Sequence, residues 1–201
     1  MRKGFLFIIS GPAGSGKGTV VKSILEKHPD VKLSISMTTR QPRGTERPDV
    51  EYYFVTKEAF LDNIAKGEML EHAIYNGNYY GTPKSMVLDS LEKGNDVILE
   101  IEVEGAMQVK ASYPEAIAIM LTPPDSKTLE GRLRGRGTES EENILKRLEK
   151  AKTEITFLPK YDYSVINEDG GVEKCADLIY SIMQAEHSRT IHTSEIIKEF
   201  E

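Results

Sequence analysis

Apolar residues along this chain form short unbroken runs that alternate with amphipathic stretches. The first run, FLFIIS (5–10), has the composition of a strand that is buried on both faces. The segment TVVKSILEKHP (19–29) follows and predicts a helix with one apolar stripe, which Pro29 ends. The stripe comprises Val20, Val21, Ile24 and Leu25.

The same alternation continues through the second half of the chain. Apolar runs predict strands at 96–102, 116–121 and 163–167. Amphipathic stretches predict helices at 104–112, 126–134, 141–157 and 172–188. Strands that alternate with helices are typical of an α/β fold, in which helices flank a parallel sheet.

Residues 34 to 82 depart from this alternation. The segments EYYFVT (51–56) and MLEHAIYNGNYYGT (69–82) predict short strands, the latter around an NG turn. The segment KEAFLDNIAKG (57–67) predicts a helix between them. Because short antiparallel strands fit poorly into a parallel sheet, we expect this segment to form an inserted lobe of mixed α/β structure.

Composition narrows the classes of function. The 201 residues carry a net charge of −6, which argues against a general nucleic-acid binder. A single cysteine, Cys175, excludes an internal disulfide and favours the cytosol, and no segment resembles a signal peptide or a membrane span. The histidines lack metal-ligand spacing, so we interpret them and the cysteine as structural; they are His28, His72, His187 and His192.

The segment GPAGSGKGT (11–19) lies between the first strand and the first helix. Backbone N–H groups of a glycine-rich turn at a helix N-terminus bind phosphate, and Lys17 adds a positive charge. This context favours a phosphate loop of the P-loop NTPase type over a flexible turn without a ligand. The predicted phosphate-binding residues are Gly11, Pro12, Ala13, Gly14, Ser15, Gly16, Lys17, Gly18 and Thr19.

Gly18 departs from the usual motif, which has Ser or Thr directly after the lysine. The hydroxyl that usually contacts Mg²⁺ is therefore missing. Because Mg²⁺ keeps several waters in many phosphate sites, we expect a metal near Thr19 and Glu100 that is held largely through water.

A second anion site is predicted in SISMTTRQPRGTERPDVEYYFVT (34–56). Arg40 and Arg43 are three residues apart on a loop bent by Pro and Gly, so they can grip one phosphate. Tyr52 and Tyr80 add hydroxyl donors. Taken alone, the two arginines are also consistent with a solvated loop.

Six blocks together resemble one family. They occur in the order and spacing of the guanylate kinase family and span residues 4–188; they are GPAGSGKGT, SMTTRQPRGTE, YYF, GNYYGT, ILEIEVEGA and RLRGRGTESEENILKRL. The resemblance implies Mg²⁺-dependent transfer of the γ-phosphoryl group of ATP to GMP or dGMP. We expect a core domain of residues 1–33 and 83–189, a GMP-binding lobe at 34–82, a mobile lid at about 126–150 and a tail at 190–201.

The resemblance also assigns an acceptor site. Glu71 would accept both the N1–H and the N2–H₂ donors of guanine, and the Thr82 hydroxyl would donate to O6. Adenine lacks this donor pair, and sites of this kind discriminate by about 10⁴–10⁵-fold. Without the surrounding blocks, Glu71 could equally be a solvated residue. The acceptor-site residues implied are Ser36, Arg40, Arg43, Tyr52, Glu71, Tyr80, Thr82 and Glu102.

Glu100 and Glu102 are two residues apart in ILEIEVEG, so in a strand they share one face. We expect them at the carboxyl end of the strand, with Glu100 near the metal and Glu102 near the acceptor. The family often has the shorter Asp at both positions, so the contacts could be direct or through water. A solvated edge strand is the alternative.

Arginines are concentrated in GRLRGRGTESEENILKRLEKA, and the glycines there predict a lid that closes. The resemblance places Arg132, Arg136 and Arg147 around the transferred phosphate, whereas Arg134 has no counterpart. A salt-bridged helix surface is the alternative interpretation. Asn167 matches a position near the adenine of ATP. The residues expected to act on the reacting group are Lys17, Arg43, Arg136 and Arg147.

Three other functions fit these residues less well. A non-catalytic guanylate-kinase-like interaction module would not need Lys17 and the lid arginines. A kinase for a sugar phosphate or another nucleotide would not use the pattern of Glu71 with Thr82. A regulatory GTPase would not need an acceptor-phosphate site. The sequence does not distinguish a monomer from a homo-oligomer.

Overall fold

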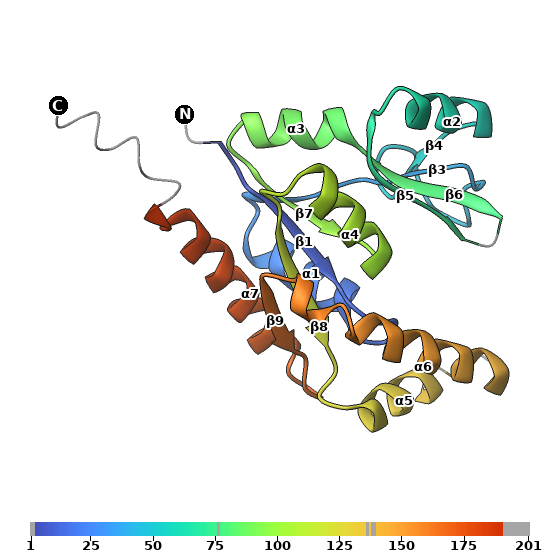
Figure 1. The fold of residues 1–201 in the computed structure, drawn as a ribbon, viewed down its shortest axis with the longest axis vertical. Helices are drawn as coiled ribbons and strands as arrows, with labels where there is room; N and C mark the ends of the chain where they lie inside the picture. The colour runs from blue at the N-terminus through green and yellow to red at the C-terminus, as the bar shows by residue number, and fades with distance from the viewer. Residues whose placement is uncertain (1–2, 76, 136, 138–139, 191–201) are drawn as a thin grey trace.

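The computed structural model describes residues 3–75, 77–135, 137 and 140–190, and it contains two sheets (Figure 1). In the larger sheet all four strand pairs are parallel, so the predicted parallel sheet is confirmed. Its strands in spatial order are β2 (Val31–Leu33), β7 (Asp96–Glu100), β1 (Leu6–Ser10), β8 (Ile117–Thr122) and β9 (Tyr163–Ile166).

Helices cover both faces of this sheet, as the unbroken apolar runs require. Along β1, Phe7 and Ile9 pack toward α1 (Lys17–Lys27) and α7 (Val172–His187). Leu6 and Ile8 belong to the cluster on the other face, with α3 (Lys84–Glu92) and α4 (Val103–Ser112). Because successive strand residues point to opposite faces, one strand contributes to two cores.

The first helix differs from the prediction at both ends. It was expected at 19–29 but begins at Lys17 and ends at Lys27. It begins earlier because Gly16, at φ 94°, is its N-cap, and the carbonyl of Gly16 accepts the first helical hydrogen bond from Val20. The helix axis therefore starts directly at the predicted phosphate loop.

The predicted strand 96–102 is two residues too long. Strand β7 ends at Glu100, and Glu102 is the N-cap of α4 with extended φ and ψ of −73° and 162°. The expectation that Glu100 and Glu102 share a strand face is therefore wrong, because the chain turns into a helix between them.

Residues 37–83 form the second sheet. Its strands in spatial order are β4 (Tyr53–Phe54), β3 (Met37–Thr38), β6 (Asn78–Pro83) and β5 (Met69–Tyr75), and α2 (Lys57–Ala65) precedes β5. The hairpin of β5 and β6 is antiparallel as expected, with Gly77 at φ 75° in its turn, whereas β3 and β4 pair in parallel. The expectation of antiparallel pairing is thus wrong for the predicted strand at 51–56, because β4 pairs in parallel with β3, a strand that was not predicted and that a connection of fourteen residues joins to β4.

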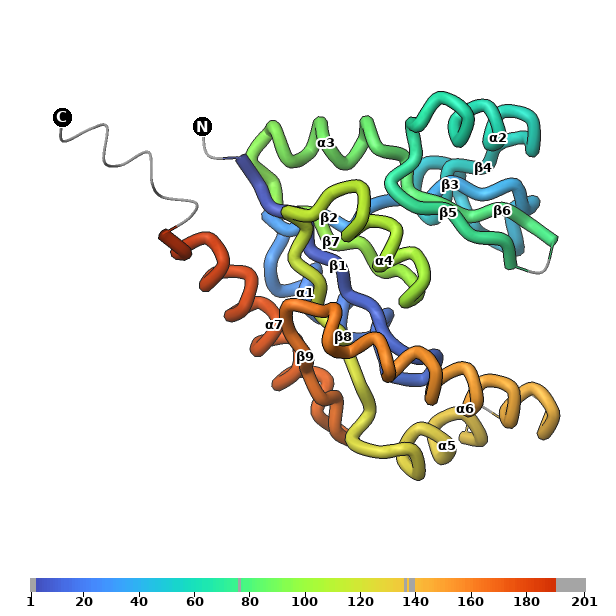
Figure 2. The backbone as a smooth tube through the Cα atoms, in the orientation of Figure 1, coloured from blue at the N-terminus to red at the C-terminus, as the bar shows by residue number. Residues whose placement is uncertain are grey.

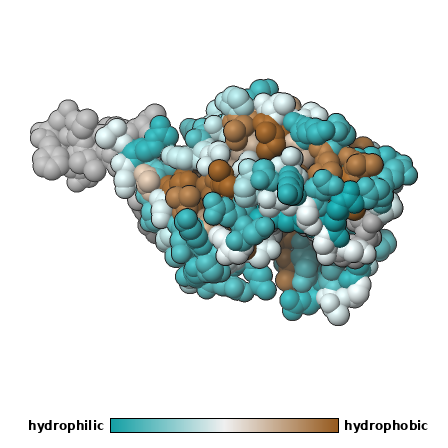
Figure 3. Space-filling model, turned by 90° about the horizontal axis from the view of Figure 1, so that it is seen from below, coloured by the Kyte–Doolittle hydropathy of each residue, from teal (hydrophilic) through white to brown (hydrophobic). Residues whose placement is uncertain are grey.

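Two more helices, α5 (Ser126–Gly135) and α6 (Glu141–Ile155), pack on each other through Leu129, Leu133, Ile144 and Ala151. A short 3₁₀ helix at Leu158–Lys160 follows α6. The α5–α6 pair and the second sheet project from the same side of the core (Figures 1 and 2). Seen from the side of α5 and α6, the surface is mostly hydrophilic with separate apolar patches (Figure 3).

Candidate active site

The phosphate loop connects the carboxyl end of β1 to the N-terminus of α1. Gly11 has φ 148°, and a Cβ there would lie 2.1 Å from the carbonyl oxygen of Leu121 on β8. A Cβ at Gly16 would lie 2.4 Å from Nδ2 of Asn167. Glycine is therefore required at both positions, and the N–H groups of the loop lie at the positive end of the helix.

Lys17 lies at the first turn of α1 and bends back over this loop. Its Nζ donates to the carbonyl oxygens of Gly11 and Pro12, at 2.6 and 3.3 Å. Burial lowers the pKa of Lys17, while the negative charge of Glu102, Glu100 and a further carboxylate raises it. The ammonium group is thus placed between the phosphate loop and a cluster of acids.

Asn167, which follows β9, lies beneath the loop. It is 3% exposed, and its Nδ2 donates to the carbonyl oxygen of Ser15 at 2.8 Å. Arg132 of α5 donates to the carbonyl oxygen of Asn167 at 2.7 Å and forms an ion pair with Asp169, also at 2.7 Å. The structure therefore brings two of the predicted donor-site residues together and adds Asp169, which the sequence did not indicate.

Three buried polar atoms near the loop have no hydrogen-bond partner among the described residues. They are Oγ of Ser15, Oδ1 of Asn167 and one Nη of Arg132. An unsatisfied buried polar atom costs free energy unless a ligand or water supplies a partner. These atoms fit a polar ligand with both donors and acceptors, such as a nucleotide.

Glu100 ends β7 beside α1. A Cβ placed on Gly18 would be 3.4 Å from Oε1 of Glu100, so the missing side chain leaves space in front of this carboxylate. Burial raises the pKa of Glu100, and Lys17 lowers it. Within the described ranges no three Asp, Glu, His or Cys side chains converge as metal ligands. One carboxylate fits a metal that keeps most of its waters.

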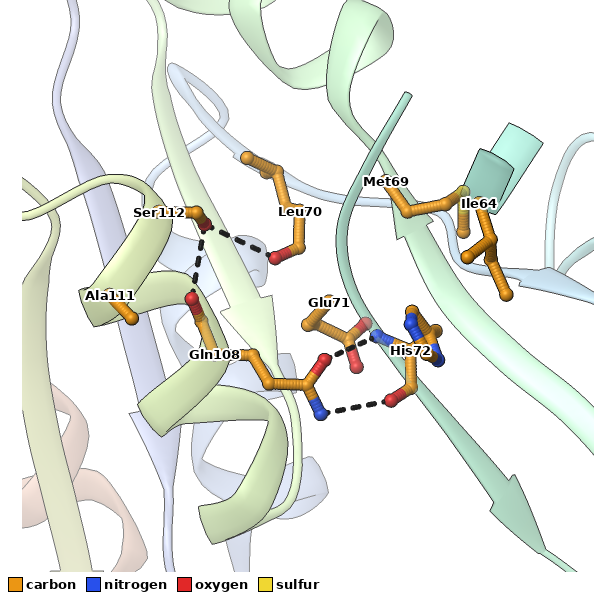
Figure 4. A pocket seen from close by; sticks show the side chains of 8 residues that line it. All are labelled: Ile64, Met69, Leu70, Glu71, His72, Gln108, Ala111 and Ser112. Atoms are coloured by element: carbon orange, nitrogen blue, oxygen red, sulfur yellow. Dashed lines mark hydrogen bonds between the residues drawn. The ribbon is translucent and has the colours of Figure 1, made fainter. Parts of the chain in front are cut away.

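Glu71 lies on β5 and is 7% exposed (Figure 4). Its Oε1 accepts a hydrogen bond of 2.7 Å from the hydroxyl of Thr82, which faces it on β6. Burial raises the pKa of Glu71, and the hydrogen bonds from Thr82 lower it. The hydroxyl of Thr82 thus donates a hydrogen bond to Glu71 in this structure, and its donation to O6 of guanine stays a prediction.

Arg40 is held in a fixed orientation at the edge of the second sheet. Its guanidinium donates to both carboxylate oxygens of Glu46, at 2.7 and 3.0 Å, and lies 5.2 Å from the ring centre of Tyr52. The hydrogen bond from Arg40 lowers the pKa of Glu46 to about 2. Tyr80 contacts Tyr52 edge to face, with ring centres 6.0 Å apart. Arg40, Tyr52 and Tyr80 therefore lie together, and they are three of the four residues predicted to bind the phosphate of the acceptor.

Arg43 and Ser36 are less constrained. Arg43 is exposed, and its backbone N–H donates to Glu46 at 2.8 Å. Ser36 is half-buried just before β3, and its carbonyl accepts from Tyr53 at 2.9 Å. Glu46 therefore organises the loop that carries both arginines, although the sequence pattern did not single it out.

Glu102 links the core to α6. Lys150 donates to Glu102 at 2.6 Å and also pairs with Glu154 at 3.3 Å. Burial opposes ionisation of Glu102, but the hydrogen bond from Lys150 and the charge of Lys17 outweigh it and lower its pKa. The sequence offered no signal for this contact, which spans 48 residues.

The remaining arginines of the predicted lid divide into two kinds. Arg147 is half-buried on α6, whereas Arg134 forms ion pairs with Glu130 and Glu141, as expected of a residue without a functional counterpart. Arg136 lies outside the described residues.

Two of the histidines, His28 and His187, and the cysteine have structural environments, whereas His192 lies outside the described residues. His187 binds Asp96 at 2.7 Å and stacks on Phe5, and His28 stacks on Tyr180. Burial raises the pKa of Cys175 to about 11.

A phosphate loop at the carboxyl edge of a parallel sheet, with an acid and arginine cluster on a second sheet, is the arrangement of a P-loop kinase that acts on a nucleoside monophosphate. The comparisons with known proteins agree with this class. The family model described as guanylate kinase matches residues 3–186. The chain belongs to the guanylate kinase family.

Individual relatives cover nearly the whole chain. A guanylate kinase from Lactococcus lactis is 50% identical over 187 residues, which are 93% of this chain and 90% of the relative. One from Caldanaerobacter subterraneus is 45% identical over 195 residues, 97% of this chain and 94% of the relative. The crystal structure of guanylate kinase from Anaplasma phagocytophilum matches with a TM-score of 0.73 at 33% identity, and covers 94% of this chain and 89% of that one.

Proposed function

We propose that the protein transfers the γ-phosphoryl group of ATP to GMP or dGMP, with Mg²⁺, and releases ADP and GDP or dGDP. Its family membership supports this guanylate kinase activity (EC 2.7.4.8). The observation that carries the assignment of the acceptor is the buried carboxylate of Glu71 on the second sheet. We place the reaction in purine nucleotide metabolism in the cytosol. No helix of the described residues has the length and apolar character to cross a membrane.

Guanine recognition follows from the hydrogen-bonding capacity of Glu71. With Oε1 already bound to Thr82, the carboxylate keeps lone pairs on both oxygens for the adjacent N1–H and N2–H₂ donors of guanine. Adenine presents an acceptor at N1, so a lone pair of the buried carboxylate would face another acceptor instead of a donor. The buried charge of Glu71 is costly unless donors pair with it, so it favours guanine over adenine.

The phosphate of GMP would bind near Arg40, Arg43, Tyr52 and Tyr80. Glu46 holds the guanidinium of Arg40 with two hydrogen bonds, so Arg40 would present its charge to the phosphate in a fixed orientation. Arg43 is exposed on the same loop and can add a second charge. Ser36 and Glu102 would complete the acceptor site.

ATP would bind over residues 11–19, with its phosphates at the N-terminus of α1. The ammonium of Lys17 would exchange the loop carbonyls for the β- and γ-phosphates. Asn167 would contact the adenine end, and Arg132 would add positive charge near the transferred phosphate. Glu100, with Thr19, would hold Mg²⁺ largely through water, and the metal would neutralise charge on the phosphates.

Transfer needs no general base. An oxygen of the GMP phosphate, already ionised near neutral pH, bonds to the γ-phosphorus while the bond from that phosphorus to the β–γ bridging oxygen breaks, and ADP leaves with the electron pair. Lys17, Arg136 and Arg147 would stabilise the charge on the migrating group, and closure of residues 126–150 would exclude water.

The test is an ATP-consumption assay with GMP, dGMP, AMP, UMP and dTMP. We expect turnover with GMP and dGMP only, loss of turnover with EDTA and its return on addition of excess Mg²⁺. A preference for AMP or a pyrimidine nucleotide would refute the proposed acceptor.

A further inference from the structure

We propose that Gln108 of α4 is a positioning residue for guanine recognition, because its side-chain amide fixes the strand that carries Glu71. Gln108 is outside every motif described above, and it would not contact the nucleotide. This inference rests on the proposed role of Glu71 as the guanine-binding carboxylate.

The amide of Gln108 pairs with the open edge of the second sheet (Figure 4). Its Oε1 accepts from the backbone N–H of His72 at 3.0 Å, and its Nε2 donates to the carbonyl oxygen of His72, also at 3.0 Å. The amide therefore replaces one residue of a neighbouring strand. Because His72 follows Glu71 directly, both hydrogen bonds act on the backbone next to the carboxylate.

Strand β5 needs this support at this point. Its register with β6 shifts between Met69 and Glu71, so Leu70 is an additional residue in the ladder. Such irregularities weaken local pairing and change the direction of side chains. Pairing with β6 alone thus fixes Glu71 less firmly than a regular ladder would.

Helix α4 also sets the space available to the carboxylate. A Cβ on Gly105 would be 2.9 Å from Oε2 of Glu71, so the helix backbone lies directly against this side chain. Gly105 and Gln108 are three residues apart and lie on one face of α4. Ser112, one further turn along, is 3.4 Å from the carbonyl oxygen of Leu70. Three positions of one helix thus contact the strand on both sides of Glu71.

Helix α4 belongs to the core, since Ala106 and Val109 pack in the cluster on the α3–α4 face of the larger sheet. Gln108 therefore connects the carboxylate proposed to bind guanine to the core whose larger sheet also carries the phosphate loop. Loss of the amide would let Glu71 move relative to the bound base without removing any group that contacts it.

The test compares Gln108→Met, which keeps length but has no hydrogen-bonding amide, with Gln108→Asn, whose amide is one methylene too short. Gln184→Met, at an exposed position on α7, is the matched control. For each protein, kcat and KM are measured with GMP, with IMP, which lacks the N2 amino group, and with ATP. Hydrogen exchange reports the protection of the His72 amide.

We expect both Gln108 variants to raise the KM for GMP by about 5- to 30-fold, as loss of one or two hydrogen bonds predicts. The preference for GMP over IMP should shrink, the His72 amide should exchange faster, and the KM for ATP should not change. The Gln184→Met control should match the parent protein in every measurement.

Three results would overturn the inference: an unchanged GMP/IMP preference, equal losses for GMP and ATP, or absence of a cooperative unfolding transition in both Gln108 variants. Glu71→Gln, measured in parallel, separates this inference from the proposed site. If Glu71→Gln keeps the GMP/IMP preference, the role of Glu71 itself is wrong. If the Gln108 variants keep the GMP/IMP preference and Glu71→Gln loses it, the proposed role of Glu71 is supported and Gln108 has no positioning role.

Discussion

Replacement of Glu71 by Gln alters one atom of a side chain that is 7% exposed. The amide oxygen of Gln can still accept from Thr82, which now binds Oε1 at 2.7 Å, so the strand contact survives. The amide nitrogen of Gln is a donor and would face one of the guanine donors, so these two groups cannot form a hydrogen bond. One charge-assisted hydrogen bond is lost, worth about 1.5–3 kcal/mol, which corresponds to a roughly 10- to 150-fold decrease in kcat/KM for GMP.

The same substitution should improve AMP as a substrate. An amide can donate to N1 of adenine and accept from its N6 amino group, whereas a carboxylate can only accept. The assay is initial-rate kinetics with GMP and AMP at saturating ATP, with thermal unfolding as the control for folding. The substitution removes a buried charge, so the unfolding temperature at neutral pH should not fall. Unchanged GMP/AMP discrimination in a folded Glu71→Gln protein would refute the recognition mechanism.

The titration of Glu71 gives this prediction a pH dependence. Because burial raises its pKa above the ordinary value of 4.5, protonation begins at a higher pH than for an exposed glutamate. A protonated Glu71 can no longer accept both guanine donors, so the KM for GMP should rise as the pH falls toward and through this raised pKa. The Glu71→Gln protein should lack this acidic rise, and its presence there would point to a different group.

Three further substitutions test the other parts of the site. Lys17→Met should lower kcat by about 10²–10³-fold with little change in unfolding temperature, because it removes a preorganised charge; single-turnover kinetics measures this, and near-normal transfer would contradict the role. Gly16→Ala places a Cβ 2.4 Å from Asn167 at φ 94°, so chemical denaturation should show a loss of about 1–3 kcal/mol, and an unchanged unfolding midpoint would show that the loop adapts. Arg40→Lys cannot form two parallel hydrogen bonds, so the KM for GMP should rise by about tenfold while that for ATP stays constant; equal changes would argue against an acceptor-phosphate site.

The sequence predicted those parts of the fold that a single local pattern of residue types identifies. The apolar run at 5–10 and the glycine-rich loop identified the first strand and the phosphate loop, because burial on both faces and a conformation accessible to glycine leave direct traces in residue type. Strand β2 and helix α3 were missed: β2 has three residues, two of them exposed, and α3 has only two buried positions.

The site was predictable only where a residue belongs to a motif. Glu46, Gln108, Asp169 and Lys150 were not found, since each acts through a partner that folding brings to it. Gln108 contacts a strand 36 residues earlier, and Lys150 a carboxylate 48 residues earlier. Spacing along one element carries no information about such pairs, so only the folded chain reveals them.

The internal hydrogen bonds of Lys17 have a consequence for selectivity among the anions of a cell. Nζ donates to the carbonyl oxygens of Gly11 and Pro12, so an incoming anion gains more than one of its three N–H donors only if these loop contacts break. A small ion such as chloride or orthophosphate offers few additional contacts to offset that exchange. A long polyanion that also reaches the helix N-terminus and the residues beyond it makes many additional contacts. The hydrogen bonds between Lys17 and its own loop therefore favour binding of polyanions over binding of small ions.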